Sequence, residues 1–159
     1  MSFDEECEIE NSDALEELFA HHVFPLPEKT MQKTIIATTD APQAIGPYSQ
    51  AIRVGNLLFL SGQIALDPAS GELVTTSFEA QVRRVFANIQ AVLNAAGANF
   101  SHVAKTTVFL KDMAKFAEMN GIYAEFFPED PPARSAVEAA RLPKDVDIEI
   151  EVIAFMGDA

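Results

Sequence analysis

The chain has 159 residues, of which 48% are hydrophobic and 22% charged, the size and composition of one folded domain rather than of a disordered protein. The net charge of −13 disfavours nucleic-acid binding, because a strongly acidic surface repels phosphate backbones. One cysteine and three histidines are too few for a disulfide framework or for a zinc site of clustered Cys and His ligands.

The charge divides the chain into two parts. Residues 1–30 contain nine acids and one base, whereas residues 31–159 carry a net charge of only −5. The break ends in Phe24-Pro25-Leu26-Pro27, and two prolines so placed stop a helix and favour extended chain. We therefore expect an acidic N-terminal appendage, 1–30, and a domain, 31–159. Within the appendage, Asn11–Asp13 could cap a short helix, or the segment could be a mobile tail.

Sequence patterns in the first half of the domain predict three strands and a helix. Strands are expected at 33–37, 50–54 and 57–60, the last two joined by a hairpin turn at Gly55. A second turn is expected at 67–71. Thr76 and Glu79 then have the spacing of a capping box, and apolar residues recur at helical period from Val82 to Ala96. Gly97 stands where a helix end favours left-handed backbone.

The second half predicts three further strands around one more helix. A strand rich in Thr, Val and Phe is expected at 103–110, followed by a helix that Asp112 could cap and Pro128 would stop. The closing strands are expected at 133–137 and 146–155, the latter with alternating apolar and acidic residues. Two helices against one sheet predict an α+β two-layer domain.

Four segments contain residues that could carry chemistry. In Ala44–Gln50, a Gly-Pro bend places Tyr48 near a strand, although a buried, packed ring is the more common outcome. In Ser61-Gly62-Gln63, glycine lets another group approach the backbone closely, and a bulge is the simpler interpretation. In Pro131–Val137, a partly buried Arg134 must be paired, either with an internal acid or with a ligand carboxylate.

The fourth segment, Arg141–Asp145, leads into a strand with carboxylates on one side. Asp147, Glu149 and Glu151 would ordinarily form a solvated sheet face. The alternatives are that they meet the arginine of a partner subunit or hold a water molecule for general-base catalysis.

Together these segments resemble the Rid/YjgF family of reactive intermediate deaminases over essentially all of 31–159. The resemblance implies a chorismate-mutase-like α+β domain, with a mixed β-sheet and two helices on one face. It also implies a homotrimer with clefts between subunits, and cofactor-free hydrolysis of 2-imino acids such as 2-iminobutanoate and 2-iminopropanoate to 2-oxo acids and ammonia. The matching segments are Ala41-Pro42, Ala44–Ala51, Ser61–Ile64, Asn88-Ile89, Gly97, Lys105–Phe109, Pro132–Ser135, Arg141–Asp145 and Ile148–Glu151.

By position, the resemblance assigns Arg134 to the substrate carboxylate and Glu149 to the activation of water. It assigns Tyr48, Ser61 and Asn120 to the lining of the cleft. Ala136 departs from the pattern, since many members have a cysteine there, so a thiol-dependent property should be absent. Residues 1–30 have no counterpart in the family pattern. An imine carbon is already electrophilic, so water attack requires neither a metal nor a covalent nucleophile.

Three alternatives remain beside the enzyme. A catalytically idle member could bind small carboxylates as a regulator, although the intact Arg134 and Glu149 favour the enzyme. An RNA-cleaving translation inhibitor is disfavoured by the acidic charge and by the lack of a basic patch with interleaved aromatics. A holdase-like chaperone would need an exposed apolar patch. No apolar run reaches the roughly 20 residues of a membrane span and no secretory signal is visible, so we expect a cytoplasmic protein with no membrane partner.

Overall fold

The structure, a computed structural model, describes residues 32–157 of the chain. The acidic appendage 1–30, with its candidate helix, lies outside the described residues, and the domain boundary remains a prediction.

The domain is built on a six-stranded sheet with the strand order β1-β2-β3-β6-β4-β5. All neighbouring strands are antiparallel except β4 and β5, which pair in parallel. The predicted strands are all present, with ends shifted by a few residues. Their bounds are β1 Lys33–Ile36, β2 Ala51–Val54, β3 Leu57–Gln63, β4 Val103–Leu110, β5 Ala133–Glu138 and β6 Ile148–Phe155.

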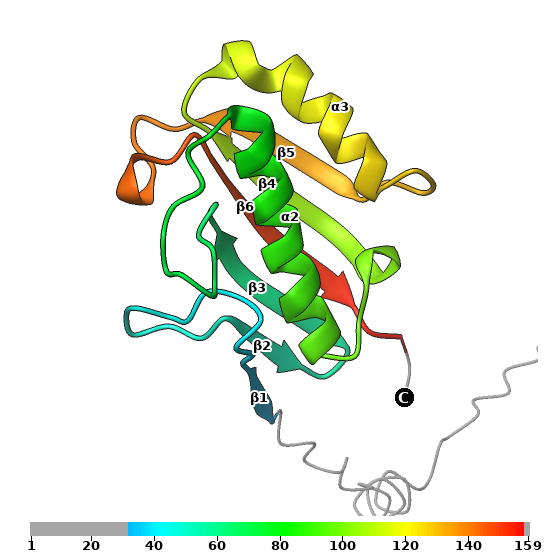
Figure 1. Ribbon diagram of the computed structural model, residues 1–159. Coiled ribbons are helices and arrows are strands. Elements are labelled where there is room, and N and C mark those ends of the chain that lie inside the picture. Colours follow the sequence, from blue (N-terminus) through cyan, green and yellow to red (C-terminus); the bar gives the residue numbers. More distant parts are fainter. Residues whose placement is uncertain (1–31, 158–159) are drawn as a thin grey trace, which may run out of the picture. The chain divides into compact units, whose positions relative to one another are not determined.

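Two helices, α2 (Phe78–Ala95) and α3 (Phe116–Phe126), cover one face of this sheet (Figure 1). The core lies between the two layers, where Phe86 of α2 is fully buried and stacks on Phe126 of α3 with ring centroids 4.2 Å apart. The mixed sheet with two helices on one face confirms the predicted α+β architecture.

The helix ends correct two details of the prediction. The N-cap of α2 is Ser77, whose side chain accepts a hydrogen bond from the Ala80 amide, so the capping box expected from Thr76 is wrong by one residue. Asp112 caps only the 3-10 turn η2 (Met113–Lys115) before α3, not α3 itself. Gly97 has φ +77°, which confirms the expected left-handed helix end.

The strand that contains Ser61 is longer and less regular than expected. β3 continues through Gln63, and its pairing with β6 shifts register between Leu60 and Gln63. The predicted bulge at Ser61-Gly62-Gln63 is therefore confirmed. β6 begins at Ile148, two residues later than predicted, and is preceded by another 3-10 turn, η3 (Pro143–Asp145). A third turn, η1 (Phe100–His102), was not predicted.

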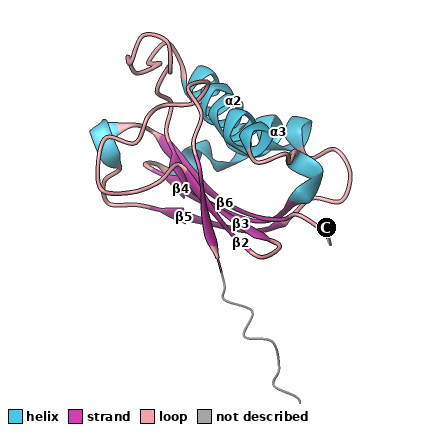
Figure 2. Cartoon of the chain, turned by 90° about the horizontal axis from the view of Figure 1, so that it is seen from below, coloured by secondary structure: helices cyan, strands magenta, loops and turns pink. Residues whose placement is uncertain are grey.

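The face of the sheet opposite the helices carries no described element (Figure 2). Residues in β6 alternate between buried positions under the helices and positions on this open face, where Glu149, Glu151 and Phe155 lie. Large apolar side chains of β1, β3 and β6 also lie on the open face, because the strand register aligns them with the outward-facing residues of β6. They are Ile35, Leu57, Phe59 and Phe155, which are 64%, 42%, 37% and 49% exposed.

Candidate active site

A pocket of about 350 Å³ opens where the bulged end of β3 lies beside the start of β6. It brings together three of the predicted site residues, Tyr48, Ser61 and Glu149. The full lining is Ile45, Tyr48, Ser61, Gly62, Ile64, Pro143, Lys144 and Glu149. Segments far apart in the sequence therefore converge on one concave site, as small-molecule pockets require.

Glu149 reaches this pocket because Gly62 has no side chain. A β-carbon at Gly62 would overlap Glu149 Oε1 and lie 2.8 Å from Cδ, so the carboxylate occupies space that any other residue would fill. The expectation that this glycine permits a close approach is confirmed. Burial raises the pKa of the half-buried Glu149 carboxyl, and the charge of Glu151 on the same face raises it further. A carboxylate with a raised pKa is a stronger base than an ordinary one.

The hydroxyl of Ser61 is oriented by the neighbouring strand. Its Oγ donates a hydrogen bond to the carbonyl oxygen of Ser49 (2.7 Å), and its backbone amide donates to the carbonyl of Gln50 (3.0 Å). With its only proton so used, Ser61 Oγ can act toward a ligand as an acceptor. Within the single chain Tyr48 is 51% exposed, so its ring is not packed into the core of the domain, which was the more common outcome expected from the sequence.

One wall of the pocket is anchored to the core helix. Asn88 of α2 is fully buried, and its side-chain amide donates to the carbonyl oxygens of Ile64 (3.0 Å) and Leu66 (2.9 Å). These two bonds tie the chain that leaves β3 to the helix layer.

The opposite wall is a turn with unusual backbone. Lys144 and Asp145 have φ of 55° and 58°, the left-handed region that side chains other than glycine seldom adopt. Arg141 closes the turn, donating to the Asp145 carboxylate through Nε (2.7 Å) and Nη2 (2.9 Å). The turn brings Lys144 to the lining of the pocket. Neither Lys144 nor the apolar lining residues Ile45, Ile64 and Pro143 was predicted individually, since nothing in their local sequence indicates a pocket.

Arg134 does not line this pocket but lies against helix α3. Its guanidinium carbon is 4.6 Å from the ring centroid of Tyr123 and 5.5 Å from that of Phe116, both on α3. Thr106 pairs with Arg134 in β5 and with Val152 in β6, so all three side chains point to the helix side of the sheet. Glu149 is three residues from Val152 and therefore points to the open face.

Asn120 belongs with Arg134 rather than with the pocket. It lies on α3 between Phe116 and Tyr123, and its Oδ1 is buried with no hydrogen-bond partner among the described residues. The predicted site residues thus form two groups within one chain, Tyr48, Ser61 and Glu149 on the one hand and Arg134 and Asn120 on the other.

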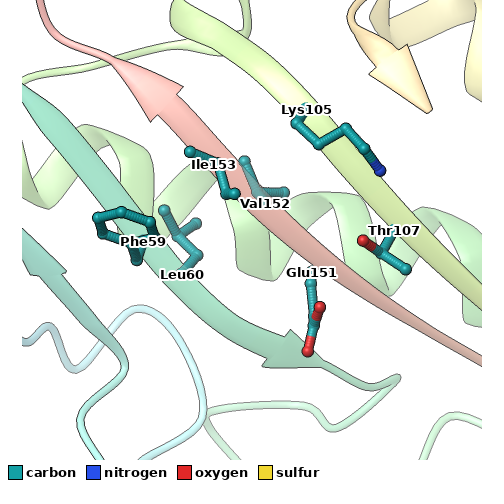
Figure 3. A pocket seen from close by; sticks show the side chains of 7 residues that line it. All are labelled: Phe59, Leu60, Lys105, Thr107, Glu151, Val152 and Ile153. Atoms are coloured by element: carbon teal, nitrogen blue, oxygen red, sulfur yellow. The ribbon is translucent and has the colours of Figure 1, made fainter. Parts of the chain in front are cut away.

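The open face holds two further hollows. One, of about 220 Å³, is lined by Lys105 and Thr107 of β4, Glu151 of β6 and apolar residues of β3 and β6 (Figure 3). Lys105 Nζ donates to Ser135 Oγ (3.1 Å) and to the carbonyl of Thr106 (2.9 Å). The other, of about 320 Å³, adjoins the candidate site through Tyr48 and Ser61.

Between residues 32 and 157, no group of three His, Cys, Asp or Glu side chains could hold a metal ion. Over the same range, no helix has the length and apolarity to cross a membrane.

Comparison with known proteins gives one consistent match. The model of a family described as endoribonuclease L-PSP matches residues 38–156. A RutC family protein from Pyrococcus horikoshii is 57% identical over 77% of this chain and 98% of its own length. Reactive Intermediate Deaminase A, chloroplastic, from Arabidopsis thaliana is 47% identical over 80% of this chain and 68% of its own length. A solved structure of a Rid family protein from Yersinia pestis is 46% identical with a TM-score of 0.76, covering 78% of this chain and 99% of that one.

Proposed function

This chain belongs to the Rid/YjgF family, whose model is described as endoribonuclease L-PSP, and from the geometry of its pocket we propose that it hydrolyses 2-imino acids to 2-oxo acids and ammonia. The observation that carries the proposal is the Glu149 carboxylate, seated against Gly62 with a raised pKa in a pocket shared with Tyr48 and Ser61. Such a group suits a reaction that needs one activated water molecule. The deaminase name of the relative from Arabidopsis thaliana supports the same chemistry.

In the proposed reaction the substrate is the protonated imine (iminium), and Glu149 takes a proton from water while the water oxygen bonds to the iminium carbon. The C=N electron pair moves to nitrogen, which gives a carbinolamine. Glu149 then returns its proton to that nitrogen. The C–N bond breaks, ammonia leaves, and the Glu149 carboxylate accepts the hydroxyl proton as the hydroxyl oxygen becomes the carbonyl of the 2-oxo acid. Ser61 Oγ would accept a hydrogen bond from the iminium N–H, since its own proton is donated to Ser49.

The substrate carboxylate requires a cation, and Arg134 is the group we assign to it. A guanidinium binds a carboxylate through two parallel hydrogen bonds. Because Arg134 and Glu149 point to opposite faces of one sheet, both can act on one molecule only if a second copy of the chain supplies one of them. We therefore include in the proposal a homotrimer with the sites between its subunits.

Two features of the described domain support assembly. The open face of the sheet presents the exposed apolar side chains of Ile35, Leu57, Phe59 and Phe155, and apolar side chains grouped on one face are typical of an interaction surface. β5, which carries Arg134, is an edge strand with one side unpaired. Association of copies would cover the apolar face and bring the Arg134 edge to a neighbour.

Ribonuclease activity, which the family description names, has less support in this chain. The net charge is −13, and among residues 32–157 Lys144 is the only cationic residue that lines the candidate pocket. An RNA substrate would meet repulsion rather than a basic groove.

The experiment that tests the activity follows release of ammonia and 2-oxo acid from an imine generated in situ, with buffer as the blank. We expect the full-length protein to accelerate release, and Glu149→Gln to remove most of the acceleration. Release at the buffer rate with a folded protein would refute the proposal. Cleavage of RNA, or binding of 2-oxo acids without turnover, would favour the alternative functions instead.

The shared site has its own test, in which two inactive variants are mixed. When Arg134→Ala and Glu149→Gln chains are unfolded together and refolded in equal amounts, about a quarter of sites between subunits receive both intact residues. Partial recovery of activity is therefore expected, with each variant refolded alone as the control. If one chain supplied both residues, mixing would restore nothing.

A further inference from the structure

Arg134 has a set of partners that is unusual for a half-buried cation. Among residues 32–157, no carboxylate forms an ion pair with its guanidinium. The sequence predicts that Arg134 pairs either with an internal acid or with a ligand carboxylate, and no internal acid pairs with it within this range. A partly desolvated cation without any partner would be costly. Two aromatic rings take the place of the acid.

These rings come from a single face of α3. Phe116 and Tyr123 are seven residues apart, about two turns, so both point toward the sheet. Their ring centroids lie 5.5 Å and 4.6 Å from the Arg134 guanidinium carbon, within the range of a cation–π interaction. We call Phe116 and Tyr123 the aromatic cradle of Arg134.

The Tyr123 ring is itself held in place. Its hydroxyl shares a buried hydrogen bond of 2.8 Å with Thr106 Oγ1 of β4. Thr106 is the residue paired with Arg134 in the parallel register of β4 and β5. Tyr123 therefore contacts both strands: its hydroxyl is hydrogen-bonded to Thr106 of β4, and its ring covers the side chain of Arg134 in β5. Burial raises the pKa of Tyr123, so the hydroxyl keeps its proton across the neutral range.

We propose that the aromatic cradle positions Arg134 for the substrate carboxylate, with Thr106 fixing the Tyr123 ring; this rests on the proposed function. Contact through the faces of two rings stabilises the cation while leaving its N–H groups for hydrogen bonds to a ligand. An internal acid would neutralise the guanidinium and occupy those donors. The cradle also selects arginine over lysine, since a planar guanidinium lies against a ring face and retains its fork.

The first test changes one ring at a time. Phe116→Leu and Tyr123→Leu should each raise KM about 3- to 30-fold, the range of a partly desolvated cation–π contact, with little change in kcat. Phe116→Tyr retains a ring and should restore KM. The matched control is Phe126→Leu, which removes an aromatic ring of α3 that packs on Phe86 and Phe100. We expect it to lower thermal stability without raising KM.

The second test asks whether the effect passes through Arg134. In an Arg134→Ala background, Phe116→Leu should leave KM unchanged, because the cation that it positions is gone. A purely structural role would give the same fold-change in both backgrounds and would overturn the proposal, as would an unchanged KM in folded Phe116→Leu and Tyr123→Leu single variants.

A binding measurement separates this proposal from the deaminase function. Calorimetric titration with 2-oxobutanoate, and with its methyl ester, needs no turnover. The cradle variants should weaken binding of the acid about 3- to 30-fold and leave the ester unaffected. If the wild-type protein binds the acid but releases no ammonia, the proposed function fails while the cradle stands. Equal loss for acid and ester would overturn the cradle alone.

Discussion

Substitution of Gly62 by alanine should separate catalysis from folding. A β-carbon there would overlap Oε1 of Glu149 and lie 2.8 Å from its Cδ and 3.0 Å from its Cγ. The backbone of Gly62 lies outside the left-handed region, so alanine meets no strain of its own. The clash is with the far end of a flexible side chain, which can rotate away. The carboxylate would then leave the position from which it reaches water.

The magnitudes differ widely for the two properties. General-base catalysis contributes about 10²- to 10⁴-fold, so kcat should fall by at least about 100-fold in Gly62→Ala. The free energy of unfolding should change by less than about 1 kcal/mol, since alanine restricts the unfolded chain while the displaced carboxylate finds solvent. Steady-state ammonia release and thermal unfolding on the same preparation measure both quantities.

Two further variants show whether the loss acts through Glu149. Gly121→Ala is the matched control, because a methyl on this exposed helical glycine would meet nothing within 4 Å. It should retain full activity and gain about 0.5–1 kcal/mol of stability. In a Glu149→Gln background, Gly62→Ala should lower kcat little further, because the carboxylate that it displaces is already absent. Wild-type kcat in a folded Gly62→Ala protein would refute the catalytic placement of Glu149.

Other expectations concern charge and the extent of the domain. Glu151→Gln removes a repulsion that raises the pKa of Glu149, so the acidic limb of the kcat/KM profile should move to lower pH. A raised pKa means that the ionised Glu149 carboxylate destabilises the folded protein, so Glu149→Gln should raise Tm at neutral pH. The gain in Tm should vanish in acid, where the carboxyl is protonated in both the folded and the unfolded protein. Arg134→Ala should lower kcat/KM about 30-fold to several thousand-fold while Tm stays unchanged. Arg134→Lys keeps the charge but loses the planar fork, so it should restore only part of the lost kcat/KM. Deletion of residues 1–30 should leave assembly and activity intact, because the family match covers only 38–156. Light scattering and the ammonia-release assay measure the two properties, and a monomeric or inactive product would contradict this prediction.

Local patterns were sufficient for most of the fold. The helical period of α2, the alternation in β6 and the bulge at Ser61-Gly62-Gln63 are encoded by neighbouring residues, and each prediction is confirmed. The cap of α2 was misplaced because Thr76 and Ser77 are adjacent hydroxyl residues, and only the backbone conformation decides between them.

The arrangement of the site depends on pairing that no local pattern contains. Whether Arg134 shares a face with Glu149 is decided by the register of β5 on β4 and of β4 on β6, between strands far apart in sequence. The left-handed Lys144 and Asp145 were also not predictable, because the usual signal for that backbone is glycine. The family resemblance named the residues, and the structure shows which of them one chain can bring together.

The buried amide of Asn88 ties the pocket to the core helix α2. Its two hydrogen bonds hold the carbonyls of Ile64 and Leu66 against α2, so that segment can detach only if the amide loses both partners inside the core. Hydrogen exchange of the amides around this wall should thus follow the global unfolding of the domain rather than local loop fluctuation. A ligand would meet a wall that is already shaped, and little of its binding free energy would be spent on ordering the chain.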